Sequence, residues 1–94
     1  MYARVVRFTG VEPKSIDNVK AEVDASDGPP PGVNARSMQM LYDADQGTSL
    51  FIAYFENAED MAEADRIMGA MDVADTPGTR ASVDMSEVVI EREA

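Results

Sequence analysis

The chain has 94 residues, which predicts one domain spanning residues 1–94. Its 18 acidic and 8 basic residues give a formal net charge of −10, which opposes contacts with nucleic-acid phosphates or an anionic membrane surface. The absence of cysteine excludes disulfides and thiolate chemistry, and no apolar run reaches the roughly 18 residues of a membrane span or forms a signal peptide. The composition therefore predicts an acidic protein with a cytoplasmic location.

The first half of the chain predicts a strand, a helix and a second strand. These elements are a strand over residues 2–9, a helix over about 13–25 and a strand over about 35–42. Pro13 suits the first turn of the helix, and the prolines between Gly28 and Gly32 make a stiff connection to the next strand. The residues predicted to form the buried stripe of the helix are Ile16, Val19 and Val23.

The second half repeats this order after a hairpin loop at residues 43–47. Its elements are a strand over residues 48–55, a helix over about 58–71 and a strand over about 80–91. Asn57 is predicted to cap the helix, with acidic residues favoured by the helix dipole in the first turn. The apolar side of this helix is predicted to consist of Met61, Ala64, Ile67, Met68 and Met71.

The final strand changes its apolar side along its length. Thr76-Pro77-Gly78 precedes the strand and breaks the chain. Ala81, Val83 and Met85 share one face, whereas Val88 and Ile90 share the other. A bulge near Ser86-Glu87, or burial of both faces, would reconcile the two halves of this strand.

The order βαββαβ predicts an α+β, ferredoxin-like fold, with a four-stranded antiparallel sheet and two helices on one face. In this layout the strands at residues 2–9 and 48–55 are central. The strand at 48–55 is apolar on both faces, with Leu50, Ile52 and Tyr54 on one side and Phe51, Ala53 and Phe55 on the other. Two helices cover only one face of the sheet, so we expect a second copy of the chain to cover the other face in a sheet-to-sheet homodimer.

Residues 54–65 run from an aromatic pair and a glutamate through a short polar turn into an amphipathic helix. This segment resembles the strand-to-helix passage of antibiotic-biosynthesis-monooxygenase-like members of the dimeric α/β-barrel superfamily. The resemblance implies two ferredoxin-like sheets packed face to face with helices outside, and cofactor-independent oxygenation of an aromatic or polyketide-like metabolite. Asp65 stands about where such family members often carry a helix histidine. The chain has no histidine or tryptophan, which excludes an imidazole haem ligand and a histidine base.

The polar residues left to form a ligand site are few. The candidate ligand-binding residues are Tyr42, Tyr54, Asn57, Asp65, Arg36 and Arg80. For the tyrosines we favour packing in the sheet, for Asn57 a helix cap, and for Arg36 and Arg80 surface ion pairs. No metal site and no cofactor is predicted, because Asp43-Ala44-Asp45 fits a hairpin loop better than a calcium loop.

Two further groups of residues allow more than one interpretation. Arg4 and Arg7 lie in a strand predicted to be central, so one of them is expected to pair with Asp84 or Glu87, or across the dimer. The seven methionines favour core filling over a soft pocket for a hydrophobic ligand. An RNA-recognition domain shares the element order but is disfavoured by charge and by the pattern of residues 50–55.

The sequence leaves two functional hypotheses open. The first is a small-molecule-binding or accessory module without catalysis, with a small hydrophobic or aromatic ligand. The second is a cofactor-independent monooxygenase in which a tyrosine or an aspartate aids deprotonation of the substrate. The missing histidine and tryptophan favour the first hypothesis slightly, and whether the chain is an enzyme stays open.

Overall fold

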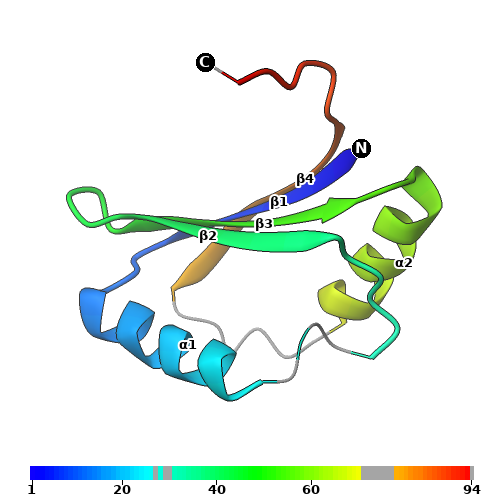
Figure 1. Cartoon of the computed structure of the whole chain (residues 1–94). Coiled ribbons are helices and arrows are strands. Elements are labelled where there is room, and N and C mark those ends of the chain that lie inside the picture. Colours follow the sequence, from blue (N-terminus) through cyan, green and yellow to red (C-terminus); the bar gives the residue numbers. More distant parts are fainter. Residues whose placement is uncertain (27, 29–30, 71–77, 94) are drawn as a thin grey trace.

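Two strand–helix–strand units build one antiparallel sheet, and both helices lie on the same face of it (Figure 1). The computed structural model describes residues 1–26, 28, 31–70 and 78–93. The elements are β1 (Tyr2–Thr9), α1 (Pro13–Ala25), β2 (Ser37–Asp43), β3 (Thr48–Phe55), α2 (Ala58–Gly69) and β4 (Thr79–Glu87). The strand order is β2-β3-β1-β4, and all neighbouring strands are antiparallel. The fold is therefore ferredoxin-like, as predicted, with β1 and β3 in the centre.

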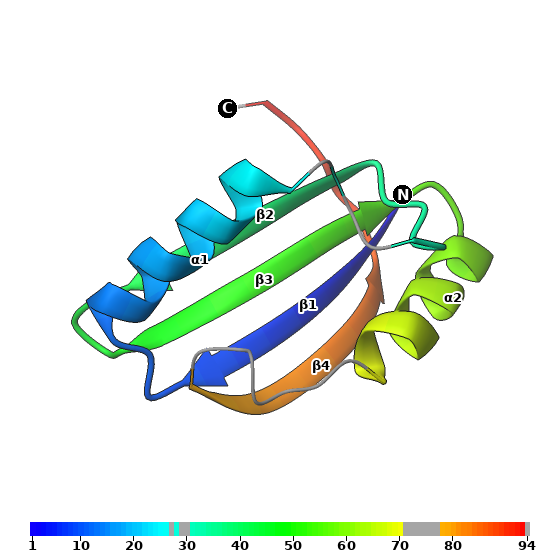
Figure 2. The same cartoon turned by 90° about the horizontal axis from the view of Figure 1, so that it is seen from below.

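The strand register decides which side chains share a face. Val6 lies opposite Phe51 on β3 and opposite Val83 on β4, so these three side chains point toward the helices. Val5 lies opposite Ile52 and Asp84, and these point the other way. We call this second surface the open face, because both helices cover the opposite face, which is turned toward the viewer in Figure 2. Its residues, read from the register, are Ser37, Gln39, Leu41, Asp43, Thr48, Leu50, Ile52, Tyr54, Ala3, Val5, Arg7, Ser82, Asp84 and Ser86.

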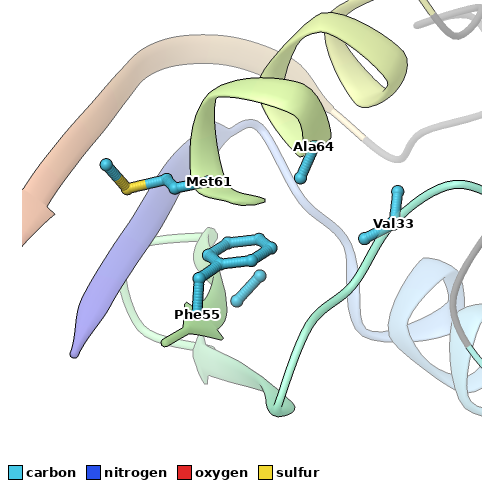
Figure 3. Close-up of a cluster of buried hydrophobic side chains, with 5 residues drawn as sticks. Val33, Phe55, Met61 and Ala64 are labelled. Atoms are coloured by element: carbon cyan, nitrogen blue, oxygen red, sulfur yellow. The ribbon is translucent and has the colours of Figure 1, made fainter. Parts of the chain in front are cut away.

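The core lies between the sheet and the helices, in two clusters. Figure 3 shows the first cluster, in which the fully buried Phe55 of β3 points toward α2. Its buried members are Val33, Ala53, Phe55, Met61 and Ala64, with Ile67 and Met68 packed against them. The second cluster, Val6, Phe8, Val11 and Ile16, attaches α1 to the sheet. Met40 packs against that cluster, so the methionines Met40, Met61 and Met68 fill core space.

The first helix is held more loosely than its apolar pattern predicts. Ile16 is buried and Val19 is half-buried, but Val23 is 59% exposed. The prediction of a buried stripe is therefore wrong at Val23. The predicted helix apolar side is confirmed in α2 for its four described members, and Met71 lies outside the described residues.

The predicted hairpin loop between β2 and β3 is confirmed. The Asp43 Oδ1 accepts the backbone N–H groups of Asp45 and Gln46, at 3.1 and 3.2 Å. The Asp43 Oδ2 accepts the Gln46 side-chain amide at 3.0 Å, and Gly47 turns the chain with a φ of 66°. The Asp43 carboxylate is thus used within its own turn.

The edge strands differ from prediction at their ends. β2 begins at Ser37, two residues later than expected, and β4 ends at Glu87, not at Glu91. The register shift lies between Arg7 and Phe8, opposite Ser82 and Arg80, so the bulge near Ser86-Glu87, one of the two explanations offered for this strand, is wrong. Thr76 and Pro77 lie outside the described residues. In the part of the chain that the structure describes, neither helix is long and apolar enough to cross a membrane.

Candidate functional site: the open face and the Arg4–Asp65 pair

The six candidate site residues do not converge on one site. Arg36 precedes β2 and donates its backbone N–H to the Tyr54 carbonyl at 2.7 Å, while its guanidinium pairs with Glu56. Tyr54 points to the open face and donates its hydroxyl to the Gln39 Oε1 at 3.2 Å. Arg36 and Glu56 are both exposed, as expected for a surface ion pair.

Tyr42 and Arg80 lie near the opposite end of the sheet. Tyr42 is on the helix side of β2, and its hydroxyl donates to the Val11 carbonyl at 3.4 Å. Arg80 lies opposite Phe8 at the start of β4 and is exposed. Tyr42 packs against the second core cluster, which fits the packing role that its position in a strand predicts.

Asn57 is the N-cap of α2, as its sequence position predicts. Its side-chain oxygen accepts the backbone N–H of Asp60 at 2.8 Å, and Glu59 and Asp60 occupy the first turn. The Asp60 carboxylate also accepts the side-chain amides of Asn34 and Asn57, at 3.1 and 3.2 Å. These bonds tie the start of α2 to the segment before β2.

An Asn57→Ala variant is expected to lose about 1 kcal/mol of folding stability, because the first turn of α2 then has an unsatisfied N–H group. Chemical denaturation at fixed protein concentration measures this loss. Asn18→Ala, on the exposed side of α1, is the matched control and should change stability by only a few tenths of that amount. An Asn57→Ala variant as stable as the wild type would contradict the capping role.

The buried Arg4 on the helix side of β1 forms an ion pair with Asp65 of α2. The Arg4 Nε donates to the Asp65 Oδ1 at 2.9 Å, and the side chains are 3% and 37% exposed. The predicted pairing with Asp84 or Glu87 is wrong for Arg4. Asp84 lies opposite Val5 and therefore points to the open face, whereas Arg4 points toward the helices. Asp65 is a candidate from the resemblance alone. Its buried partner is Arg4, for which the sequence predicts a different partner.

The open face is the side of the sheet that neither helix covers (Figure 1). Its apolar centre consists of Leu41, Leu50, Ile52, Tyr54, Ala3 and Val5. Leu41 on the edge strand is 49% exposed. The two apolar sides of β3 are thus confirmed: one packs on the helices and the other lies in this centre.

A hollow of about 240 Å³ lies on the open face near the β2–β3 hairpin. Arg7, Leu41, Leu50 and Thr48 are among its lining residues. It is smaller than the roughly 300–1,000 Å³ of typical small-molecule pockets. Among the described residues, no group of three acidic side chains could hold a metal ion.

The surface of α2 carries a second ion pair, between the exposed side chains of Glu63 and Arg66. The hydrogen bond from Arg66 lowers the pKa of Glu63 from its ordinary value, and Glu63 in turn raises the pKa of Arg66. Because the folded-state pKa of Glu63 is lowered, the contribution of this pair is present above pH 4.5 and is lost as the pH falls through the folded pKa.

An Arg66→Gln variant is expected to raise the pKa of Glu63 back toward its ordinary value, because the hydrogen bond and the positive charge are both removed. Carboxyl-carbon NMR titration of Glu63 measures the change. Lys20→Gln on α1 removes the same charge elsewhere and should leave the titration of Glu63 unchanged. An unchanged midpoint in Arg66→Gln would contradict the pairing.

Comparison of the chain with models of known protein families, with curated proteins and with solved structures found no match. The fold and the geometry described above are therefore the basis for a functional proposal. They define a ferredoxin-like α+β protein with an apolar open face and a buried ion pair under α2.

Proposed function

We propose that the protein is a homodimeric small-molecule-binding or accessory module in which two copies pack open face on open face. The observation that carries this proposal is the apolar centre of the open face, which crosses β2, β3 and β1. In the single chain Leu41 of this centre is exposed and Leu50, Ile52 and Tyr54 are partly exposed, whereas contiguous apolar patches on monomers are small. A second copy offers the same apolar surface in a self-complementary arrangement.

The resemblance to antibiotic-biosynthesis-monooxygenase-like proteins supports the same assembly. Members of that superfamily close a barrel from two ferredoxin-like sheets with helices outside. The ferredoxin-like fold and the uncovered side of the sheet agree with such a subunit (Figure 1). The missing histidine and tryptophan favour binding over oxygenation.

A cofactor-independent monooxygenase is the second candidate, and one observation favours it. Asp65, which by resemblance takes the place of a helix histidine, is held by the buried Arg4 and is still partly exposed. A carboxylate in that setting is fixed in position and can meet a ligand. Tyr42 and Tyr54 are the other candidates for aiding deprotonation of a phenol, and they lie on opposite faces of the sheet.

Two measurements test the proposal. Sedimentation at micromolar concentration should give a dimer, and a monodisperse monomer would contradict the assembly. Oxygen uptake with a panel of hydroquinones and polyketide-like phenols separates binding from catalysis. Steady uptake that is lost in Tyr42→Phe or Tyr54→Phe would overturn the accessory role. No turnover, together with a ligand retained through purification and seen by native mass spectrometry, would support it.

A further inference from the structure

The two edge strands of the sheet differ in how well they are protected against pairing with another chain. In the described part of the chain, β2 pairs with β3 alone and β4 with β1 alone. A free strand edge presents unpaired N–H and C=O groups, and proteins protect such edges with charged residues and bulges. β4 has both protections: it carries Arg80, Asp84 and Glu87, and its register shifts near its start.

β2 lacks these protections along residues 37–42. This segment has no charged residue and no proline, and its register with β3 is continuous. Met38 on the helix side of β2 is 38% exposed, and Leu41 on the open face is 49% exposed. The outer edge of β2 is therefore a template for a further strand.

The helix α1 gives this edge an apolar cover on one side. It lies over β2 at the outer border of the sheet (Figure 2). A helix is about 10 Å wide and strands are about 4.8 Å apart, so a helix over an edge strand also reaches the next strand position. Ile16 attaches α1 to the sheet, whereas Val23 of the same stripe is exposed. The apolar side of α1 is thus only partly used by its own chain.

We propose that β2 and α1 together bind an extended segment of a partner protein, which adds a strand to the sheet at the edge of β2. Main-chain hydrogen bonds to β2 hold the segment, and alternate side chains of the segment point toward α1. These side chains are apolar, because they lie beside Val23 and Met38. This inference goes beyond the proposed function and does not depend on what covers the open face.

The charge of the chain favours a basic partner segment. The last turn of α1, which carries Val23, contains Glu22 and Asp24 and no basic residue. Asp43 ends β2, and the whole chain has a net charge of −10. Lysine or arginine at the positions that alternate with the apolar ones therefore complements this surface.

A second copy of the chain fits this edge less well than a peptide segment. An antiparallel pair of two β2 edges would bring the two α1 helices about 5 Å apart, which is the spacing of neighbouring strands. Packed helices need about 8–10 Å between their axes. An extended segment brings no helix to that position.

Peptide titration tests the site. The probe is a peptide of alternating lysine and valine with blocked ends, as long as β2, and isothermal calorimetry measures its affinity. Met38→Lys places a charge on the edge strand on the side of α1 and should weaken binding at least about tenfold. Met85→Lys is the matched control: it adds the same charge to an exposed methionine on the helix side of β4 and should leave the affinity unchanged.

A second peptide separates strand addition from attraction between charges. It has the same composition, with its lysines and valines in two blocks, so its valines cannot all point toward α1. We expect it to bind the wild type at least about tenfold more weakly than the alternating peptide. Equal affinity for the two peptides would overturn strand addition.

Further outcomes would also overturn the inference. These are no binding of the alternating peptide by the wild type, binding that Met38→Lys leaves unchanged, and binding that Met38→Lys and Met85→Lys reduce equally. Self-association of the wild type that Met38→Lys abolishes would show that a second copy occupies the edge. The proposed homodimer fails separately, through a wild type that is monomeric in sedimentation and still binds the peptide.

A variant on α1 guards against loss of the fold. Met38 belongs to neither core cluster, so Met38→Lys should keep the circular dichroism spectrum of the wild type. If it does not, Val23→Lys replaces it, since Val23 is 59% exposed, and it should weaken binding by a similar factor. Asn18→Lys, at another exposed position of the same helix, is its control and should bind like the wild type. Equal affinities of Val23→Lys and Asn18→Lys would contradict the role of α1.

Discussion

In the proposed homodimer, an Ile52→Asp variant should stay monomeric at concentrations where wild-type copies associate, or should become poorly soluble. Ile52 lies on the open face opposite Val5 and Gln39, in the middle of the apolar centre. In that proposed dimer, a carboxylate at this position would be buried without a partner in each copy. We expect the dimer dissociation constant to rise at least about 100-fold, measured by sedimentation equilibrium.

The same strand offers a matched control. Thr48 also points to the open face but lies at the hairpin end, beside Asp43 at the rim. Thr48→Asp adds the same charge where water can reach it and should change dimerisation little. Ile52 is not part of either helix-side cluster, so Ile52→Asp should keep the circular dichroism spectrum of the wild type. A folded Ile52→Asp variant that dimerises like the wild type would contradict the role of the open face.

The sequence could predict that β3 has two apolar sides but not which side meets the helices. Alternation places Phe51, Ala53 and Phe55 on one face, and hydrophobicity is similar on the other. The choice depends on β1 and α2: Phe55 packs with Met61 and Ala64, which fixes Ile52 on the open face. These contacts join β3 to α2, and the residue pattern of β3 alone does not contain them.

The end of β4 shows a different limit. Val88, Val89 and Ile90 have high strand propensity, so the sequence predicts that the strand continues to about Glu91. β4 pairs only with β1, and Tyr2 at the start of β1 already lies opposite Glu87. Among the described residues beyond this point, one backbone bond is added, from the Val88 N–H to the Met1 carbonyl at 2.9 Å. A strand ends where its neighbour ends, which local propensity does not encode.

The Arg4–Asp65 pair joins residues 61 positions apart, and no local pattern connects them. The available signal was an arginine in a strand predicted to be central, which called for a buried partner. In the predicted sheet the nearest acidic residues lie on the neighbouring strand, which favours Asp84 and Glu87 as partners. Only the strand register shows that Arg4 points toward the helices, and Asp65 of α2 lies on that side.

Removal of either partner of this pair should destabilise the fold by unequal amounts. Asp65→Ala leaves the Arg4 guanidinium almost fully buried without its anion, and breaking a buried pair in this way costs about 3 kcal/mol. For a chain of this length, that loss should lower the melting temperature by about 12–24 °C. Arg4→Met keeps the apolar stem and leaves Asp65, which is already partly exposed and can turn to water, so its cost should be about 1 kcal/mol.

A double-mutant cycle separates the ion pair from the packing. Once Arg4 is replaced by methionine, Asp65→Ala should cost much less than it does alone, because no buried cation remains to be stranded. Arg66→Gln, which breaks the exposed pair on the same helix, serves as the control and should leave the denaturation midpoint nearly unchanged. All variants are compared at one protein concentration, since the proposed dimerisation would shift apparent stability. Equal losses from Asp65→Ala and Arg4→Met, or additive losses in the double variant, would show that Arg4 is held by packing and not by its carboxylate partner.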